Sequence, residues 1–318
     1  MRAIGLFAGA LLAAPIGAHV AAQDANIRFP VSRVETLLRD SAFRPVAQEG
    51  SRFKGDRTQH VLLSFGDTTA IEVKWAPAPP GGEAFNNQPR YEAAAYALQK
   101  LFLDERDYVV PPTVLRMVSP TALTGAGGEP ARATFPGNPH ALVALQYWTS
   151  DVTPEQVFDT KRADRDSVYA RHLGNLNILT YLIRHRDANK GNVLLSVDST
   201  NPRLFAVDNG VAFASPPSDR GTDWQYLRVK RVSAGTAARL RAITDEQLTQ
   251  SLAVLAQFEP RGEAYVPVAL GANLDADRGV RQKGQTLQLG LTSYEIDGVR
   301  SRLRSLIKDI ERRTIRTF

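Results

Sequence analysis

The pattern of apolar and polar positions predicts a strand-rich region in the first half of the chain. Residues 61–65 and 70–75 are mostly apolar, and Gly66-Asp67 between them is a hairpin signal. Apolar side chains at helical spacing, and runs rich in Gly and Pro, mark helices and loops in the same region. We predict helices over 31–40 and 91–103, and loops over 76–88 and 119–140. Short, mostly apolar runs predict further strands over 113–118 and 141–148.

The second half has mainly helical spacing. Thr153 to Gln156 places an N-cap residue, a proline in the first turn and a glutamine at the third position, which is typical of a helix start. A long helix is predicted over 164–184 and two short strands over 193–197 and 204–207. We expect the remainder to be helical, with capping boxes at Thr244/Gln247 and Thr292/Glu295 and a last helix over 295–313.

This order of elements predicts an α+β fold with two lobes. The strand-rich N-lobe covers 23–148 and the helical C-lobe covers 149–318. We expect a cleft where the lobes meet, at about residue 148, and functional side chains on both of its walls.

Residues 1–22 have the features of a signal peptide. Arg2 supplies a positive n-region, residues 4–14 are apolar, and Val20-Ala21-Ala22 offers small side chains before a cleavage site. The apolar run is too short to span a bilayer. We therefore expect export to the periplasm or the medium, and no transmembrane segment elsewhere in the chain.

Composition excludes several kinds of site. None of the 318 residues is a cysteine, so disulfides, thiolate metal sites and cysteine nucleophiles are absent. The five histidines lack metal-ligand spacing, and the sequence has no G-x-S-x-G, Walker A or Rossmann glycine pattern. A net charge of +6 favours anionic partners such as nucleotides or acidic membrane surfaces. The basic face of the last helix is a solvated surface or, alternatively, a contact with an anionic membrane.

One loop carries the side chains that phosphoryl transfer requires. His185-Arg186-Asp187 followed by Asn192 has the H-R-D-x-x-x-x-N spacing, in which the aspartate orients the acceptor hydroxyl and the asparagine binds metal. Downstream, Asp208-Asn209-Gly210 follows a strand, at the position where a metal-binding aspartate is expected, and we expect Gly210 to allow the sharp turn there. Alone, each motif is also compatible with a capped turn or a hairpin turn.

The first half offers a cation for the phosphates. Lys74 lies on a predicted strand next to Val73, and Glu92 lies near the start of the following helix. A lysine–glutamate ion pair at these positions is a standard part of a kinase site. The alternative is an exposed strand lysine and a glutamate favoured by the helix dipole. Residues 50–55 offer only a weak candidate for a phosphate-covering turn.

The sequence resembles the phosphatidylinositol 3-/4-kinase-related clan over roughly residues 50–225. The resemblance is carried by 91–98, 110–114, 187–192 and 206–213, and the Asp-Asn-Gly form is its most specific mark. It is strongest to type II phosphatidylinositol 4-kinases and bacterial relatives, and more distant to secretory-pathway protein kinases. The cysteine-rich palmitoylated insertion of those lipid kinases is absent.

That resemblance implies a protein-kinase-like fold with ATP and Mg²⁺ or Mn²⁺ as cofactors. It implies that Lys74 and Glu92 form an ion pair at the nucleotide, that Asp187 is the catalytic carboxylate, and that Asn192 and Asp208 bind metal. The expected activity is transfer of the γ-phosphoryl group to a protein or lipid hydroxyl, with a phosphoinositide among the acceptors.

Two alternatives remain open at this point. Asn192-Val193-Leu194 also resembles aminoglycoside- and choline-type kinases, which act on small molecules. A pseudokinase that binds nucleotide without turnover would fit an exported chain, because the periplasm is not expected to hold ATP. In each case we expect no nucleic-acid partner, and peripheral contact with a membrane stays open.

Overall fold

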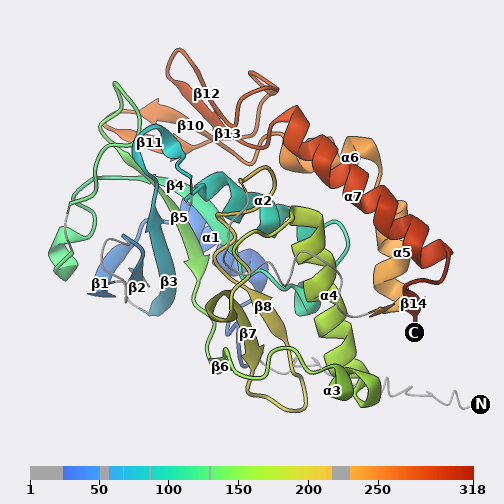
Figure 1. The fold of residues 1–318 in the computed structure, drawn as a ribbon. Coiled ribbons are helices and arrows are strands. Elements are labelled where there is room, and N and C mark those ends of the chain that lie inside the picture. The colour runs from blue at the N-terminus through green and yellow to red at the C-terminus, as the bar shows by residue number, and fades with distance from the viewer. Residues whose placement is uncertain (1–23, 51–56, 67, 86, 129, 217–229) are drawn as a thin grey trace, which may run out of the picture.

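The computed structural model describes residues 24–50, 57–66, 68–85, 87–128, 130–216 and 230–318. Its first part is a five-stranded antiparallel sheet in the order β1-β2-β3-β5-β4 (Figure 1). The strands are β1 (Arg44–Glu49), β2 (Gln59–Phe65), β3 (Thr69–Pro77), β4 (Thr113–Val118) and β5 (Ala141–Tyr147). Phe65 pairs with Thr69, so the hairpin predicted between β2 and β3 is confirmed. The strand β1 was not predicted.

Two helices pack against opposite faces of this sheet. The helix α1 (Val31–Asp40) buries Val34 and Leu38 in one apolar cluster with β3 side chains Val73 and Trp75. The helix α2 (Pro89–Gln99) lies against the other face, where its Ala93 packs with Ala76 and Ala144. Because side chains alternate along a strand, β3 presents Val73 and Trp75 to α1 and the intervening Lys74 to the α2 side.

The predicted helix start at Thr153 is wrong. Val152–Thr153 forms strand β6, which pairs with β7 (Val193–Ser196), and β7 pairs with β8 (Leu204–Ala206). The helices of this region are α3 (Thr160–Arg165) and α4 (Ser167–Ile183), not one helix over 164–184. Asp166 separates them, because its extended backbone ends α3 while its carboxylate caps α4 through the Tyr169 N–H.

The expectation that the rest of the chain is helical is also wrong in part. The helices α5 (Ala234–Ala242), α6 (Asp245–Leu252) and α7 (Ser293–Glu311) are present, and both predicted capping boxes are formed. Between α6 and α7, however, lies a four-stranded antiparallel sheet in the order β11-β10-β13-β12. Its strands are β10 (Ala256–Arg261), β11 (Ala264–Pro267), β12 (Val280–Lys283) and β13 (Thr286–Leu289).

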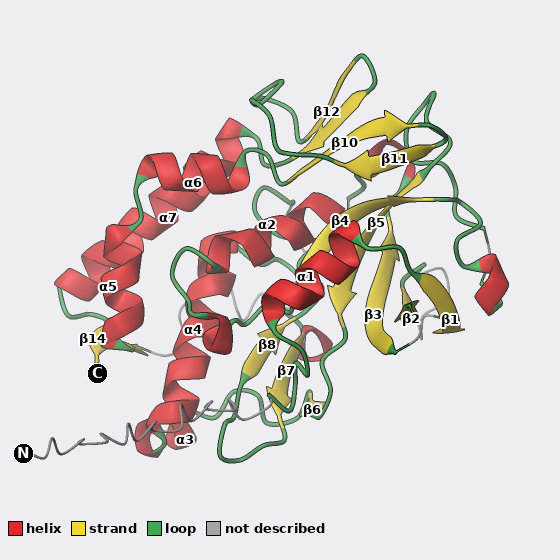
Figure 2. Cartoon of the chain, turned by 180° about the vertical axis from the view of Figure 1, so that it is seen from behind, coloured by secondary structure: helices red, strands yellow, loops and turns green. Residues whose placement is uncertain are grey.

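This second sheet packs on the first sheet although the two are far apart in sequence. Phe258, Leu287 and Leu289 join the apolar cluster that holds Leu115 and Leu142. Figure 2 shows the second sheet beside β4 and β5, with α6 and α7 running on from it over the helical part. The remaining elements are short: β9 (Arg231–Val232), β14 (Arg316–Thr317) and single turns at Pro80–Gly82, Glu105–Asp107, Thr124–Ala126 and Lys190–Asn192.

The fold is therefore mixed α+β. Helix α4 is the centre of the helical part, since Leu176, Leu179 and Leu182 are fully buried among α2, α5, α6 and α7 side chains. No helix within the described ranges is both long and apolar enough to cross a membrane.

Candidate active site

Lys74 is the centre of a cluster of charges contributed by three elements. Its Nζ lies 2.9 Å from Glu92 Oε1 and 3.1 Å from Asp208 Oδ1. The Lys74 and Glu92 side chains are largely buried, with 13% and 7% of their surface exposed, whereas 55% of the Asp208 side chain is exposed. The predicted ion pair between Lys74 and Glu92 is thus present, and Asp208 joins it from the solvent side.

Local sequence explains why Glu92 meets Lys74. Pro89 occupies the first helical position of α2, where its missing N–H costs nothing, and this places Glu92 in the first turn. A carboxylate there interacts favourably with the helix dipole. Almost every side chain of α2 is buried, so the helix and its glutamate are held firmly against the sheet.

The electrostatics of the cluster favour its charged forms. Burial would lower the pKa of Lys74, but the carboxylates of Asp208 and Glu92 more than offset this and raise it above the ordinary value. Lys74 in turn lowers the pKa of Asp208, and its charge outweighs the partial loss of hydration at this half-exposed carboxylate. Asp208 is therefore an anion at neutral pH, as a metal ligand must be.

The backbone at Asp208 differs from the prediction. Asp208 itself has φ = 60°, the left-handed conformation, whereas Gly210 does not have a positive φ. The sharp turn is thus made by the aspartate and not by the glycine. Gly210 instead lies close to the start of α2, where an added Cβ would be 3.5 Å from the Gln88 nitrogen.

Asn209 connects this turn to Glu92. Its backbone N–H donates to Glu92 Oε2 at 2.9 Å, while its side-chain amide donates to the Ala206 carbonyl at 3.3 Å. Glu92 therefore holds both Lys74 and the backbone that carries Asp208. The sequence showed only the first of these roles.

The loop that holds Asp187 begins where α4 ends. Arg184 takes a left-handed conformation (φ = 52°), which reverses the chain, and His185 is then fully buried. The loop is fixed to the segment after Asp208 by backbone hydrogen bonds from Arg186 to Val211 and from Phe213 to Ile183. A structural role for His185 agrees with this position, because its side chain lies inside the protein.

Asp187 and Asn192 lie together as the motif predicts. The Asn192 amide donates to the Asp187 carbonyl at 2.7 Å and approaches Asp187 Oδ2 at 3.5 Å. The Asn189 amide also donates to Asp187 Oδ1, at 3.2 Å. The Asn192 carbonyl accepts the N–H of Val207 at 2.9 Å, so the residue next to Asp208 is bonded directly to this loop.

The donor set suits a magnesium-type ion that is shared with a phosphate. Asp208 offers a half-exposed carboxylate, and Asn192 keeps its amide oxygen while its nitrogen donates to Asp187. The described residues contain no group of three or more His, Cys, Asp or Glu that could hold a metal alone. Mg²⁺ is commonly bound by one or two carboxylates together with substrate phosphates, which matches this arrangement.

Sequence reasoning missed a group beside Lys74 on the same face of the sheet. His60 pairs with Lys74 across β2 and β3, stacks on Trp148 with ring centroids 4.1 Å apart, and lies 3.3 Å from Glu72 through Nε2. The signal that could have found it is the strand register, since His60 and Lys74 must share a face once the hairpin is assigned.

Of the weak candidate turn at 50–55, residues 51–55 lie outside the described part, as do residues 1–22.

Comparison with known proteins identifies a similar fold but does not assign the chain to a family. No family model matches the chain, and no curated protein matches it. Among solved structures, hydra Fam20, determined with a sugar, is similar with a TM-score of 0.52 and 13% sequence identity. The similarity covers 92% of each chain. The chain therefore has a mixed α+β architecture that matches the kinase-like fold of Fam20 along almost its whole length.

Proposed function

We propose that this protein is an ATP- and metal-dependent kinase that transfers the γ-phosphoryl group to a protein or lipid hydroxyl. The observation that carries the proposal is the position of Lys74, which contacts both Glu92 and Asp208 although the three residues come from distant parts of the chain. Phosphoryl transfer depends mainly on positioned charges, and this cluster supplies them. The kinase-like fold supports the same reaction class.

Each site residue has one role in this proposal. Lys74 neutralises the phosphates of ATP, and Glu92 holds the lysine in place. Asp208 and Asn192 would hold Mg²⁺ or Mn²⁺, which supplies charge neutralisation at the transferred phosphoryl group. Asp187 accepts the proton of the acceptor hydroxyl and orients it for in-line attack on the γ-phosphorus.

The test is phosphate transfer from radiolabelled ATP with Mg²⁺ or Mn²⁺, with the protein itself, phosphoinositides, sugars and aminoglycosides as acceptors. Sugars belong in the panel because the similar hydra Fam20 structure contains one. We expect K74M and D208N to abolish transfer and the surface variant R241Q to retain it. Unchanged transfer in D208N would overturn the assignment.

A second candidate is a nucleotide-binding module without turnover. It is favoured by the direct contact of Asp208 with Lys74, because a metal ion must displace the lysine from a carboxylate that it already neutralises. Thermal shift with ATP, with and without Mg²⁺, separates the two. Stabilisation that needs no metal, together with absence of transfer to every acceptor, would favour the module.

We also propose that the protein is exported. Residues 1–22 support this through their positive start, apolar stretch and small residues before Gln23. Fusing residues 1–22 to a reporter that is active only outside the cytoplasm should give activity, and an inactive but intact fusion would contradict export. An exported kinase requires nucleotide, or another phosphoryl donor, in its own compartment.

A further inference from the structure

A second pocket lies on the face of the first sheet that is turned away from Lys74. It has a volume of about 270 Å³ and is enclosed by the outer face of β1–β3 and the loop that follows β4. Trp75 lines it, and the residue pairs with Gln59 across β3 and β2, just as Lys74 pairs with His60. Because neighbouring side chains point to opposite faces, this pocket is separate from the candidate active site.

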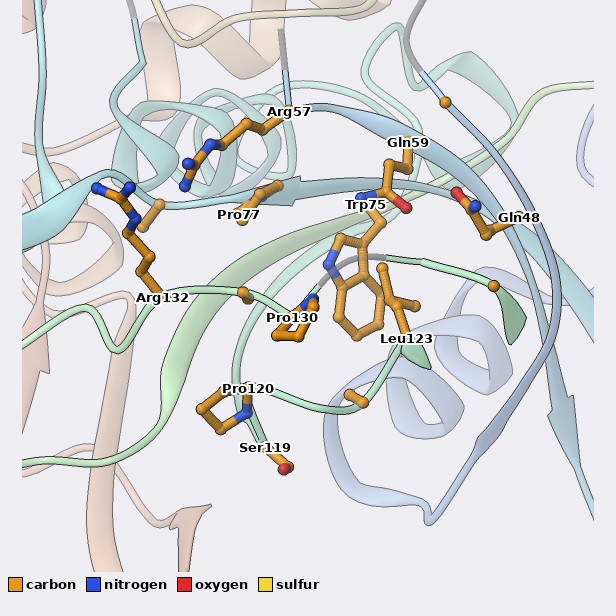
Figure 3. Close-up of a pocket in the computed structure, with 15 residues that line it drawn as sticks. Gln48, Arg57, Gln59, Trp75, Pro77, Ser119, Pro120, Leu123, Pro130 and Arg132 are labelled. Atoms are coloured by element: carbon orange, nitrogen blue, oxygen red, sulfur yellow. The ribbon is translucent and has the colours of Figure 1, made fainter. Parts of the chain in front are cut away.

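Two arginines make the pocket positively charged. Arg57, two residues before β2, and Arg132, from the loop after β4, both line it. Figure 3 shows their guanidinium groups converging on one side of the pocket, with Trp75 and Leu123 on the other. Neither arginine forms an ion pair with a carboxylate in the part of the chain that the structure describes. Two like charges that converge without a counter-charge repel each other, so an anion between them is favoured.

The other walls are suited to a small polar molecule. Gln48 and Gln59 supply amide groups, and the Gln59 Oε1 atom is buried with no hydrogen-bond partner among the described residues. A buried acceptor without a partner costs free energy, which a ligand donor would recover. Pro77, Pro120 and Leu123 provide an apolar surface for the carbon skeleton of a ligand. The volume is smaller than that of most drug-sized sites.

We propose that this pocket binds a small anion through a phosphate or carboxylate group held between Arg57 and Arg132. Guanidinium groups recognise both kinds of group by paired hydrogen bonds. The site lies directly behind the strand that carries Lys74, since Trp75 follows Lys74 in β3. The proposal does not depend on the kinase activity proposed above.

Isothermal titration of the full chain with pyrophosphate and with citrate tests this site and distinguishes its two ligand sources. We expect at least one of the two anions to bind, and R57Q/R132Q to weaken binding by about tenfold or more, because each lost charge-assisted hydrogen bond reduces affinity. Both arginines are exposed, so the variant should fold, and circular dichroism checks this. The exposed α5 variant R241Q is the matched control and should bind like the original protein.

Three outcomes would overturn the proposal. They are the absence of binding by either anion, equal affinity in R57Q/R132Q and the original protein, and an equal loss in R241Q. The variant K74M distinguishes this pocket from the active site: it should keep the binding that R57Q/R132Q loses. The reverse pattern would place the anion at Lys74.

Discussion

Arg90 donates two hydrogen bonds to Glu295, at 2.5 and 2.8 Å, and both side chains are buried. Glu295 also completes the capping box of α7 by accepting the Thr292 N–H. Burial alone would raise the pKa of Glu295, but hydrogen bonds and charge from Arg90 lower it, so the pair is ionised. Arg90 precedes Glu92 by half a turn of α2, and the pair therefore connects the start of α7 to the active-site helix.

Breaking this pair from one side should be strongly destabilising. In R90M the Glu295 carboxylate stays buried without its counter-charge, and we expect the free energy of unfolding to fall by about 3–5 kcal/mol. Urea denaturation measures this. The double variant R90M/E295Q should lose less than the sum of the two single losses, because neither charge then remains alone.

The exposed pair of Arg39 and Asp40 is the matched control for that cycle. It lies on α1 with about half of each side chain in solvent, and R39M should change stability by less than about 1 kcal/mol. Strict additivity in the Arg90–Glu295 cycle would show that the two charges do not act as a pair.

Glu92 should matter for activity beyond its pairing with Lys74. E92Q keeps the shape of the side chain but removes the charge that holds both Lys74 and the Asn209 N–H. We expect phosphate transfer to fall by about 100-fold, in the range found when one preorganised electrostatic partner is removed. Steady-state kinetics with ATP measure the effect. The nearby strand variant E72Q is a less direct comparison, since Glu72 contacts His60 instead of Lys74.

The left-handed backbone of Asp208 should affect the stability of the protein independently of the role of its carboxylate in metal binding. Alanine keeps the Cβ that makes φ = 60° costly and lacks the polar side chain with which aspartate offsets that cost, whereas glycine adopts φ = 60° freely. Both D208A and D208G should lose metal-dependent ATP binding, yet D208G should be more stable than D208A by about 1 kcal/mol. Thermal unfolding checks the order. Greater stability of D208A would mean that the turn relaxes when the carboxylate is removed.

His185 should make the protein less stable in mild acid. Burial lowers its pKa to about 4, from 6.5 when exposed. The unfolded chain therefore binds more protons than the folded chain between pH 6.5 and 4. The free energy of unfolding should fall as pH decreases through this window, with a slope of up to about 1.4 kcal/mol per pH unit from this group. Urea midpoints at pH 7 and pH 5 measure the loss.

The variant H185Q identifies the group responsible for this slope. It has no titrating imidazole, so the difference in stability between pH 7 and pH 5 should shrink relative to the original protein. His172 is also buried, with a pKa lowered to about 3, and should account for part of the slope that remains. An unchanged slope in H185Q would exclude His185 as its source.

The sequence predicted the parts of the fold that depend on neighbouring residues. The hairpin between β2 and β3, the helices α1 and α7 and the loop from Asp187 to Asn192 all follow from local spacing. The sequence also carries a signal for the second sheet: Gly262 follows, and Gly284 precedes, a short run in which apolar and polar residues alternate, and both glycines have positive φ in tight hairpin turns.

Other features depend on contacts between distant segments and could not be read from one sequence. Nothing near Arg90 indicates that its partner is Glu295. The turn at Asp208 could not be assigned either, because a glycine two residues later was the more obvious candidate for an unusual backbone. The helix start predicted at Thr153 failed for a related reason: β7 competes for that backbone and pairs with it.

The placement of the second sheet affects how the protein folds while it is being synthesised. The apolar cluster around Leu115 and Leu142 is completed by Phe258, Leu287 and Leu289, which leave the ribosome much later. Until then the emerging chain exposes an apolar surface on a sheet that is otherwise ready to form. One face of the first sheet therefore stays partly uncovered until the second sheet has been synthesised. A chaperone that shields this face would assist the nascent chain most between the emergence of β5 and that of β13.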